Sequence, residues 1–244
     1  MRRAFVASAV LLALLLPLAG AGGTRITVYA AASLTQVFPR VDRTPRYSFA
    51  GSDQLATQIR AGAPADVFAS ASPRQTELLY HDGLLRKPVV FATNKLIVIV
   101  PRSNPAGVHS VYDLRRHGVK VIVGTPTVPV GAYTRQVLDS LGITSDVTAN
   151  VVDQEPDVKS IVAKIALGEG DAGFVYRTDA RPAGKKVTPI LIPAWAQPQI
   201  RYEVGIVKAS KHRAAAALFI KRLTSLRGRR LLVQAGFGLP KRPR

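Results

Sequence analysis

The feature that most constrains the fold is a repeated alternation of short apolar runs with amphipathic stretches. Apolar runs that suit strands occupy residues 26–31, 65–69, 95–100 and 119–124, and each leads to a stretch with helical periodicity. Parallel strands need a long crossover between them, and a helix usually provides it. The alternation therefore predicts an α/β fold with mostly parallel sheets flanked by helices.

The same alternation predicts the remaining strands and helices. Further strands are expected at residues 46–50, 147–152, 171–176, 187–192 and 202–207. Helices are expected at residues 34–41, 53–61, 75–81, 111–116, 132–141, 156–167, 211–224 and 227–235. Pro156 would open its helix, because proline is favoured at the first helical position.

Four residues lie within a residue or two of an expected helix start that follows a strand. They are Ser33, Ser52, Val130 and Val158. Ser33 is a good N-cap, and Gln36 stands where its capping-box partner belongs. Helix starts present unpaired N–H groups and a positive dipole end, which favour an anion. In an open α/β sheet these turns gather at the carboxyl ends of the strands, where ligands bind.

Tyr176 ends an apolar strand and would add a third hydroxyl to those of Ser33 and Ser52. Four helix starts and three hydroxyls would make an uncharged cage of hydrogen-bond donors, which suits a fully ionised oxyanion. Each residue also has an ordinary interpretation. The serines would then be simple caps, Val130 and Val158 core residues, and Tyr176 a core tyrosine with its hydroxyl at the rim.

Other site patterns have little support. Gly168-Glu169-Gly170-Asp171-Ala172-Gly173 has the letters of a dinucleotide-binding loop, but it follows a helix and enters a strand, the reverse of the required order. The four histidines have no ligand-like spacing, and cysteine is absent. We therefore expect no metal held directly by side chains, no cofactor and no enzymatic activity.

The formal net charge of +19 invites a nucleic-acid interpretation. The basic residues are scattered, however, and no RNA-binding or zinc-finger motif accompanies them. We expect no nucleic-acid partner and interpret the charge as a solvated surface that speeds the approach of anions.

Residues 1–21 resemble a secretory signal peptide. Arg2 and Arg3 form a basic start, residues 4–16 are apolar, and Ala19-Gly20-Ala21 matches a cleavage motif. No cysteine follows for lipid attachment. The sequence therefore predicts a periplasmic or secreted protein that is not a lipoprotein.

Four segments, in order, resemble the periplasmic molybdate-binding proteins of bacterial ABC importers. They are residues 28–35 (VYAAASLT), 55–68 (LATQIRAGAPADVF), 128–133 (VPVGAY) and 171–180 (DAGFVYRTDA). The similarity runs from about residue 24 to Pro240. It implies a type II periplasmic binding-protein fold with two lobes and the anion in the cleft between them. Lobe 1 would comprise residues 24–93 and 205–240, lobe 2 residues 94–204, and a basic tail residues 241–244.

The resemblance also implies roles for particular residues. Ser33, Ser52 and Tyr176 would bind molybdate or tungstate through hydroxyls, and Val130 and Val158 through backbone amides. Val130 stands where many relatives have alanine, and Gly51 where relatives often have serine, so the cavity size is expected to differ. The protein would work as a monomer that delivers the anion to a membrane permease.

Three alternatives remain open on the sequence. The same fold could bind sulfate, thiosulfate or phosphate. A secreted hydrolase could use Ser33 as nucleophile, although no base stands at a recognisable spacing. A basic polyanion-binding protein would show nucleic-acid affinity with a steep dependence on salt.

Overall fold

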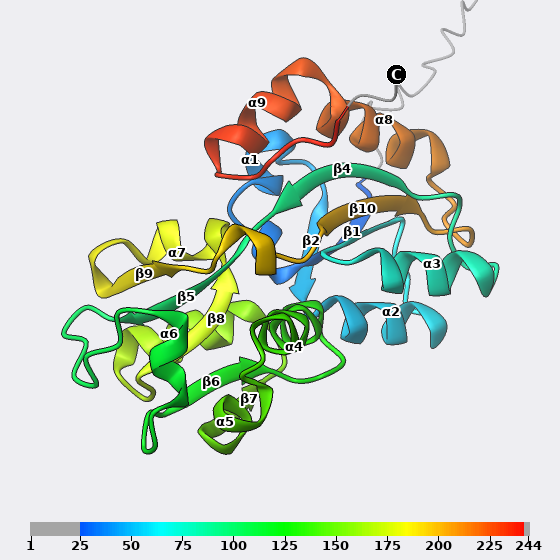
Figure 1. The fold of residues 1–244 in the computed structure, drawn as a ribbon. Coiled ribbons are helices and arrows are strands. Elements are labelled where there is room, and N and C mark those ends of the chain that lie inside the picture. The colour runs from blue at the N-terminus through cyan, green and yellow to red at the C-terminus, as the bar shows by residue number, and fades with distance from the viewer. Residues whose placement is uncertain (1–24, 242–244) are drawn as a thin grey trace, which may run out of the picture.

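The computed structural model describes residues 25–241, so the predicted signal peptide and tail residues 242–244 lie outside its described part. These described residues form two five-stranded sheets (Figure 1). The first sheet has the order β2-β1-β3-β10-β4, with β1 Thr27–Ala31, β2 Arg46–Ala50, β3 Val67–Ser70, β4 Val89–Asn94 and β10 Ile200–Ile206. The second has the order β7-β6-β8-β5-β9, with β5 Leu96–Pro101, β6 Val121–Gly124, β7 Val151–Glu155, β8 Ala172–Tyr176 and β9 Val187–Leu191.

Each sheet has four strands that run one way and a fifth that runs in the opposite direction. In the first sheet β1, β2 and β3 pair in parallel, while β10 is antiparallel to both β3 and β4. In the second sheet β6, β7 and β8 pair in parallel, and β5 is antiparallel to both β8 and β9. The chain leaves the first sheet after β4 and enters the second at the reversed strand β5. It leaves the second sheet after β9 and returns to the first at the reversed strand β10. The predicted α/β class with two helix-flanked, mostly parallel sheets is therefore confirmed.

Helices cover the sheets on both sides (Figure 1). Around the first sheet lie α1 Phe38–Val41, α2 Ser52–Arg60, α3 Pro73–His81, α8 Arg213–Thr224 and α9 Leu226–Gln234. Around the second lie α4 Pro129–Leu141, α5 Thr144–Ala149, α6 Val158–Leu167 and α7 Arg177–Ala183. Short 3₁₀ helices occupy Ala32–Leu34, Val111–Arg115, Gly184–Lys186 and Ala194–Ala196. In residues 25–241 no helix is long and apolar enough to cross a membrane.

The chain passes between the sheets twice, from β4 to β5 and from β9 to β10. Apolar strand residues such as Val28 and Val98 are fully buried beneath the helices and hold each sheet to its cover. The residue limits given above for the two lobes stay a prediction.

Several predicted elements differ from the structure. The expected helix 34–41 is a 3₁₀ helix at Ala32–Leu34 followed by the short α1. The expected strand 147–152 is wrong over its first part, because Thr144–Ala149 is helical and packs its buried Val147 inward, so that β7 begins only at Val151. Strand β4 and helix α7 were not predicted.

The starts of two helices near the candidate site also differ. α4 begins at Pro129 and not at residue 132, so proline takes the first helical position there. α6 begins at Val158, and its N-cap is Asp157. The expectation that Pro156 opens this helix is therefore wrong, because Asp157 is the N-cap and its side chain accepts the amides of Lys159 and Ser160.

Candidate functional site

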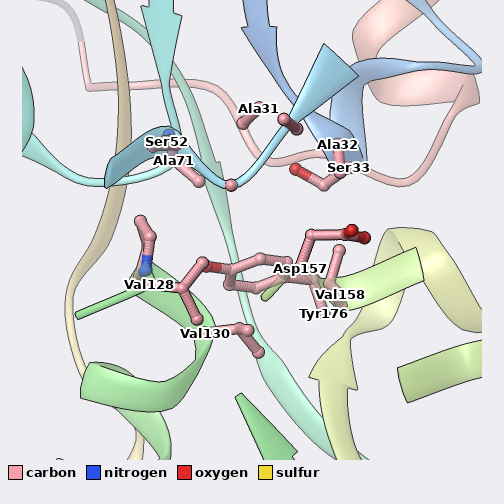
Figure 2. A pocket seen from close by; sticks show the side chains of 13 residues that line it. Ala31, Ala32, Ser33, Ser52, Ala71, Val128, Val130, Asp157, Val158 and Tyr176 are labelled. Atoms are coloured by element: carbon pink, nitrogen blue, oxygen red, sulfur yellow. Dashed lines mark hydrogen bonds between the residues drawn. The ribbon is translucent and has the colours of Figure 1, made fainter. Parts of the chain in front are cut away.

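Three neighbouring parallel strands of each sheet have their carboxyl ends at one place. Around this place lie Ser33 after β1, Ser52 after β2, Ala71 after β3, Val130 after β6, Val158 after β7 and Tyr176 at the end of β8. Together they line a single pocket, with the first-sheet residues facing those of the second (Figure 2). The structure thus brings all five predicted site residues together.

The pocket is small and its lining is almost free of charge. It encloses about 210 Å³ of space between atoms, part of which is open to solvent. Its thirteen lining residues include no lysine, arginine or histidine. Asp157 is the one charged residue among them, and its carboxylate accepts the amides of Lys159 and Ser160 at 2.7 and 3.2 Å. That carboxylate is therefore engaged by its own helix and turned away from the pocket (Figure 2).

Ser33 does not cap a helix. It is the middle residue of the 3₁₀ helix, whose N-cap position is taken by Ala31, and Gln36 is exposed, so the predicted capping box is wrong. The Ser33 side-chain oxygen lies 2.9 Å from the hydroxyl of Tyr202 on β10. A serine with helical backbone angles cannot reach its own helix amides as a cap does, which leaves its hydroxyl for the pocket.

Ser52 is the first residue of α2, one place after the N-cap Gly51, so its predicted capping role is also wrong. Its side-chain oxygen accepts the backbone N–H of Ala71 at 3.1 Å. That bond uses an acceptor site of the hydroxyl and leaves its proton available to a ligand. Ser52 is 1% exposed, so water has little access to its hydroxyl.

Val130 and Val158 occupy the first turns of α4 and α6. The first amides of a helix have no partner within it. At α6 the Asp157 carboxylate takes the amides of the second and third residues, so the amide of Val158 stays available. At α4 the N-cap Val128 has no side-chain oxygen to offer. Both helix starts therefore have backbone N–H groups available to a ligand, and their binding of an anion stays a prediction.

Tyr176 has a buried hydroxyl that lacks a hydrogen-bond partner among the described residues, which is the clearest sign that this pocket receives a ligand. Its side chain is 2% exposed. Burial raises the pKa of this hydroxyl well above its usual value, so it remains a donor at neutral pH. The hydroxyl is directed into the pocket (Figure 2). An orphaned buried donor costs free energy, which a ligand oxygen would recover.

The two sides of the pocket nearly touch at Gly51. A Cβ atom placed on Gly51 would lie 2.5 Å from the carbonyl oxygen of Pro156 and 3.2 Å from Val128 Cγ2. Nearby, the hydroxyl of Thr127 donates to the Asp53 carboxylate at 2.7 Å. Since Pro156 and Thr127 belong to the second sheet's half, the cleft is closed around the pocket.

The surroundings of Ser33 bear on the hydrolase alternative. A nucleophilic Ser33 would need a base, but the one hydrogen-bond partner of its side chain in residues 25–241 is Tyr202. Burial raises the pKa of the Tyr202 hydroxyl, so at neutral pH it keeps its own proton and cannot take one from Ser33. In this part of the chain no cluster of His, Asp or Glu is placed to hold a metal ion.

Sequence reasoning missed Tyr202 and Asn94, which stand behind Ser33. Asn94 Nδ2 donates to the Tyr202 hydroxyl at 3.3 Å. No local pattern indicates these partners, because Tyr202 is 169 positions from Ser33. Asp157, by contrast, could have been recognised, since aspartate before an apolar helical run is a usual N-cap.

Comparisons with known proteins agree with this geometry. The family model described as bacterial extracellular solute-binding protein matches residues 26–238. The molybdate-binding protein ModA of Mycobacterium tuberculosis (strain ATCC 25618 / H37Rv) is 37% identical over 229 residues, which cover 90% of this chain and 86% of that protein. The ModA protein of Haemophilus influenzae is 32% identical over 235 residues, with 89% and 91% coverage.

A solved structure supports the fold. The periplasmic molybdate-binding protein of Azotobacter vinelandii superposes with a TM-score of 0.79 at 23% identity, covering 89% of this chain and all of that one. The family match extends over most of the chain, and the relatives are aligned along nearly their whole length. The chain therefore belongs to the bacterial extracellular solute-binding protein family, among relatives named molybdate-binding proteins.

Proposed function

We propose that this protein captures molybdate, or tungstate, outside the cytoplasm and delivers it to an ABC importer. The observation that carries the proposal is the pocket without a cationic side chain in which two serine hydroxyls, two helix-start amides and the unpartnered Tyr176 hydroxyl converge. A tetrahedral dianion offers acceptors only, so a lining that offers mainly donors matches it. The names of the relatives support the same ligand.

Ser33, Ser52 and Tyr176 would hold the anion through hydroxyls, and Val130 and Val158 through amides. Because these residues come from both sheets, the ligand would bridge the halves and hold the cleft closed. We propose the lobes as residues 24–93 with 205–240, and 94–204. The exported form would begin after Ala21, act as a monomer without lipid attachment and bind no nucleic acid. No bond of the anion would be broken.

Isothermal titration tests the ligand directly. Molybdate and tungstate should bind near one to one, and sulfate should compete far more weakly. Equal affinity for sulfate would assign the protein to another oxyanion, and the absence of binding to any oxyanion would overturn the proposal.

A matched pair of serine substitutions tests the site. Ser52→Ala removes a donor to the charged ligand and should weaken molybdate binding about 10- to 150-fold, corresponding to about 1.5–3 kcal/mol. Ser140→Ala is the control, since Ser140 lies exposed on α4 and donates only to the Gln136 carbonyl. An equal effect of both substitutions would place the anion elsewhere.

A further inference from the structure

The outer layer of the first sheet carries a dense positive charge that the oxyanion pocket does not use. After Glu203 the sequence contains no aspartate or glutamate, although this stretch forms α8 and α9 and is rich in lysine and arginine. Figure 1 places α1, α8 and α9 together on the side of the first sheet opposite α2 and α3. We define the arginine face as six exposed basic residues of this layer: Arg40, Arg43, Lys221, Arg222, Arg227 and Arg230.

Part of the arginine face surrounds a depression where α1, the end of α8 and the start of α9 meet. Arg40, Arg43, Arg222 and Arg227 all line it. Asp42 is the one acidic residue in the lining, and it is buried and paired with Arg222. The remaining three arginines make no ion pair among those found in residues 25–241. Their charge is therefore available to an outside partner.

Exposed apolar side chains lie on the same two helices, α8 and α9. Leu226 is 72% exposed and Val233 51% exposed on α9, and Leu218 is 47% exposed on α8. Leu226, Arg230 and Val233 follow the spacing of one helix face, as do Leu218 and Arg222. Solvated helices normally place polar residues on that side. Exposed leucine and valine beside basic residues provide the two attractions that bind a protein to an anionic membrane surface, buried apolar area and opposite charge.

We propose that the arginine face docks the protein on a bilayer that carries anionic lipid headgroups. Arginines attract the headgroup phosphates, and the exposed leucines and valine can enter the headgroup layer. Nucleic acid would use the charge but leave the apolar side chains in water, so the lipid surface fits the face better. Such docking would hold an exported binding protein, for which no lipid anchor is predicted, near a membrane permease.

The test measures binding to vesicles of phosphatidylglycerol with phosphatidylcholine, and to phosphatidylcholine alone. The protein is expressed from residue 22, so that the apolar segment 4–16 cannot insert. We expect binding to the anionic vesicles, little binding to the neutral ones, and a steep loss as salt rises. Absence of binding to the anionic vesicles would overturn the proposal.

A charge-matched pair of variants separates the face from the net charge. The face variant Arg43→Gln, Arg227→Gln, Arg230→Gln spares Arg222, whose loss would leave Asp42 buried and unpaired. It should bind anionic vesicles about 100-fold more weakly, about fivefold for each charge near the surface. The control Lys120→Gln, Lys185→Gln, Lys186→Gln removes three exposed charges from the second sheet's half and should change binding less than about threefold. Equal losses in the two variants would overturn the proposal.

A third variant, Leu226→Ser with Val233→Ser, tests the lipid itself. Both side chains are exposed, so the fold should tolerate the change, and unaltered oxyanion titration together with thermal unfolding checks this. Vesicle binding should fall about tenfold while its salt dependence stays the same. Unchanged vesicle binding would overturn the role of the apolar side chains and leave charge alone as the attraction. DNA binding that the face variant loses, in a protein that binds no vesicles, would assign the face to nucleic acid.

Discussion

The Ser33 side-chain oxygen lies 2.9 Å from the Tyr202 hydroxyl, and Asn94 contacts the same hydroxyl. Asn94 Oδ1 accepts the backbone N–H of Lys95, which fixes the amide so that Nδ2 faces Tyr202 and Thr178. Either of the hydroxyls of Ser33 and Tyr202 can donate to the other. When Tyr202 donates, Ser33 accepts on that side and has its proton free for the pocket. An oxyanion accepts hydrogen bonds and donates none, so its binding favours this arrangement, and we infer that Tyr202 is a positioning residue that supports Ser33 as a donor.

Tyr202→Phe should weaken molybdate binding about 5- to 15-fold, because Ser33 would no longer be held as a donor and about 1–1.5 kcal/mol would be lost. In a Ser33→Ala background the same substitution should have little further effect. Isothermal titration of the four proteins in this double-mutant cycle measures the coupling. Additive losses would show that Tyr202 acts on the pocket by another route.

Tyr176→Phe should separate affinity from stability. The Tyr176 hydroxyl has no partner in residues 25–241, so its removal should leave the free energy of unfolding of the unliganded protein unchanged or raise it by about 1 kcal/mol. Molybdate affinity should nevertheless fall about 10- to 150-fold, as expected for a hydrogen bond to a charged ligand. Chemical denaturation without ligand and titration with it provide the two measurements. A destabilised protein with wild-type affinity would contradict this role.

The sequence predicted the strand–turn–helix positions of the site well because that pattern is local. An apolar run that ends in small or hydroxyl residues before a helix is visible within ten positions, as at Ser33 and Ser52. Parallel pairing then brings such turns to one edge without further information. The same reasoning placed Tyr176 at the end of β8.

The sequence could not reveal the hydrogen-bond network that orients the site residues. The sequence predicts Ser33 as a cap because the preference of serine for that position is statistical, whereas the close approach of Tyr202 depends on the β3–β10 pairing. It predicts a strand over the last residues of α5 because Val147 and Thr148 are β-branched, and packing overrides that preference. Local propensity therefore gave the positions of the donors but not the network that orients them.

Gly51→Ala should impair closure of the cleft. The added Cβ would meet the Pro156 carbonyl at 2.5 Å, and backbone atoms cannot move aside as a flexible side chain can. In an open cleft this contact is absent, so thermal unfolding without ligand should change little. Molybdate affinity should fall at least tenfold, and small-angle X-ray scattering should show less compaction on binding than in the wild type. Wild-type compaction with wild-type affinity would show that Gly51 does not limit closure.

Molybdate affinity should stay constant from neutral pH up to about pH 10. No lysine or histidine lines the pocket, and burial raises the pKa of both Tyr176 and Tyr202 well above 10.0, so these donors keep their protons. The free energy of unfolding, in contrast, should fall above pH 10, because tyrosines in the unfolded chain lose protons there while the folded ones retain them. Each retained proton contributes a slope of up to about 1.4 kcal/mol per pH unit. Tyr176→Phe should therefore reduce this slope in denaturation series at pH 10 to 11, with Tyr80→Phe, an exposed residue of α3, as the control. Affinity that falls between pH 8 and 10 would instead indicate a lysine at the anion.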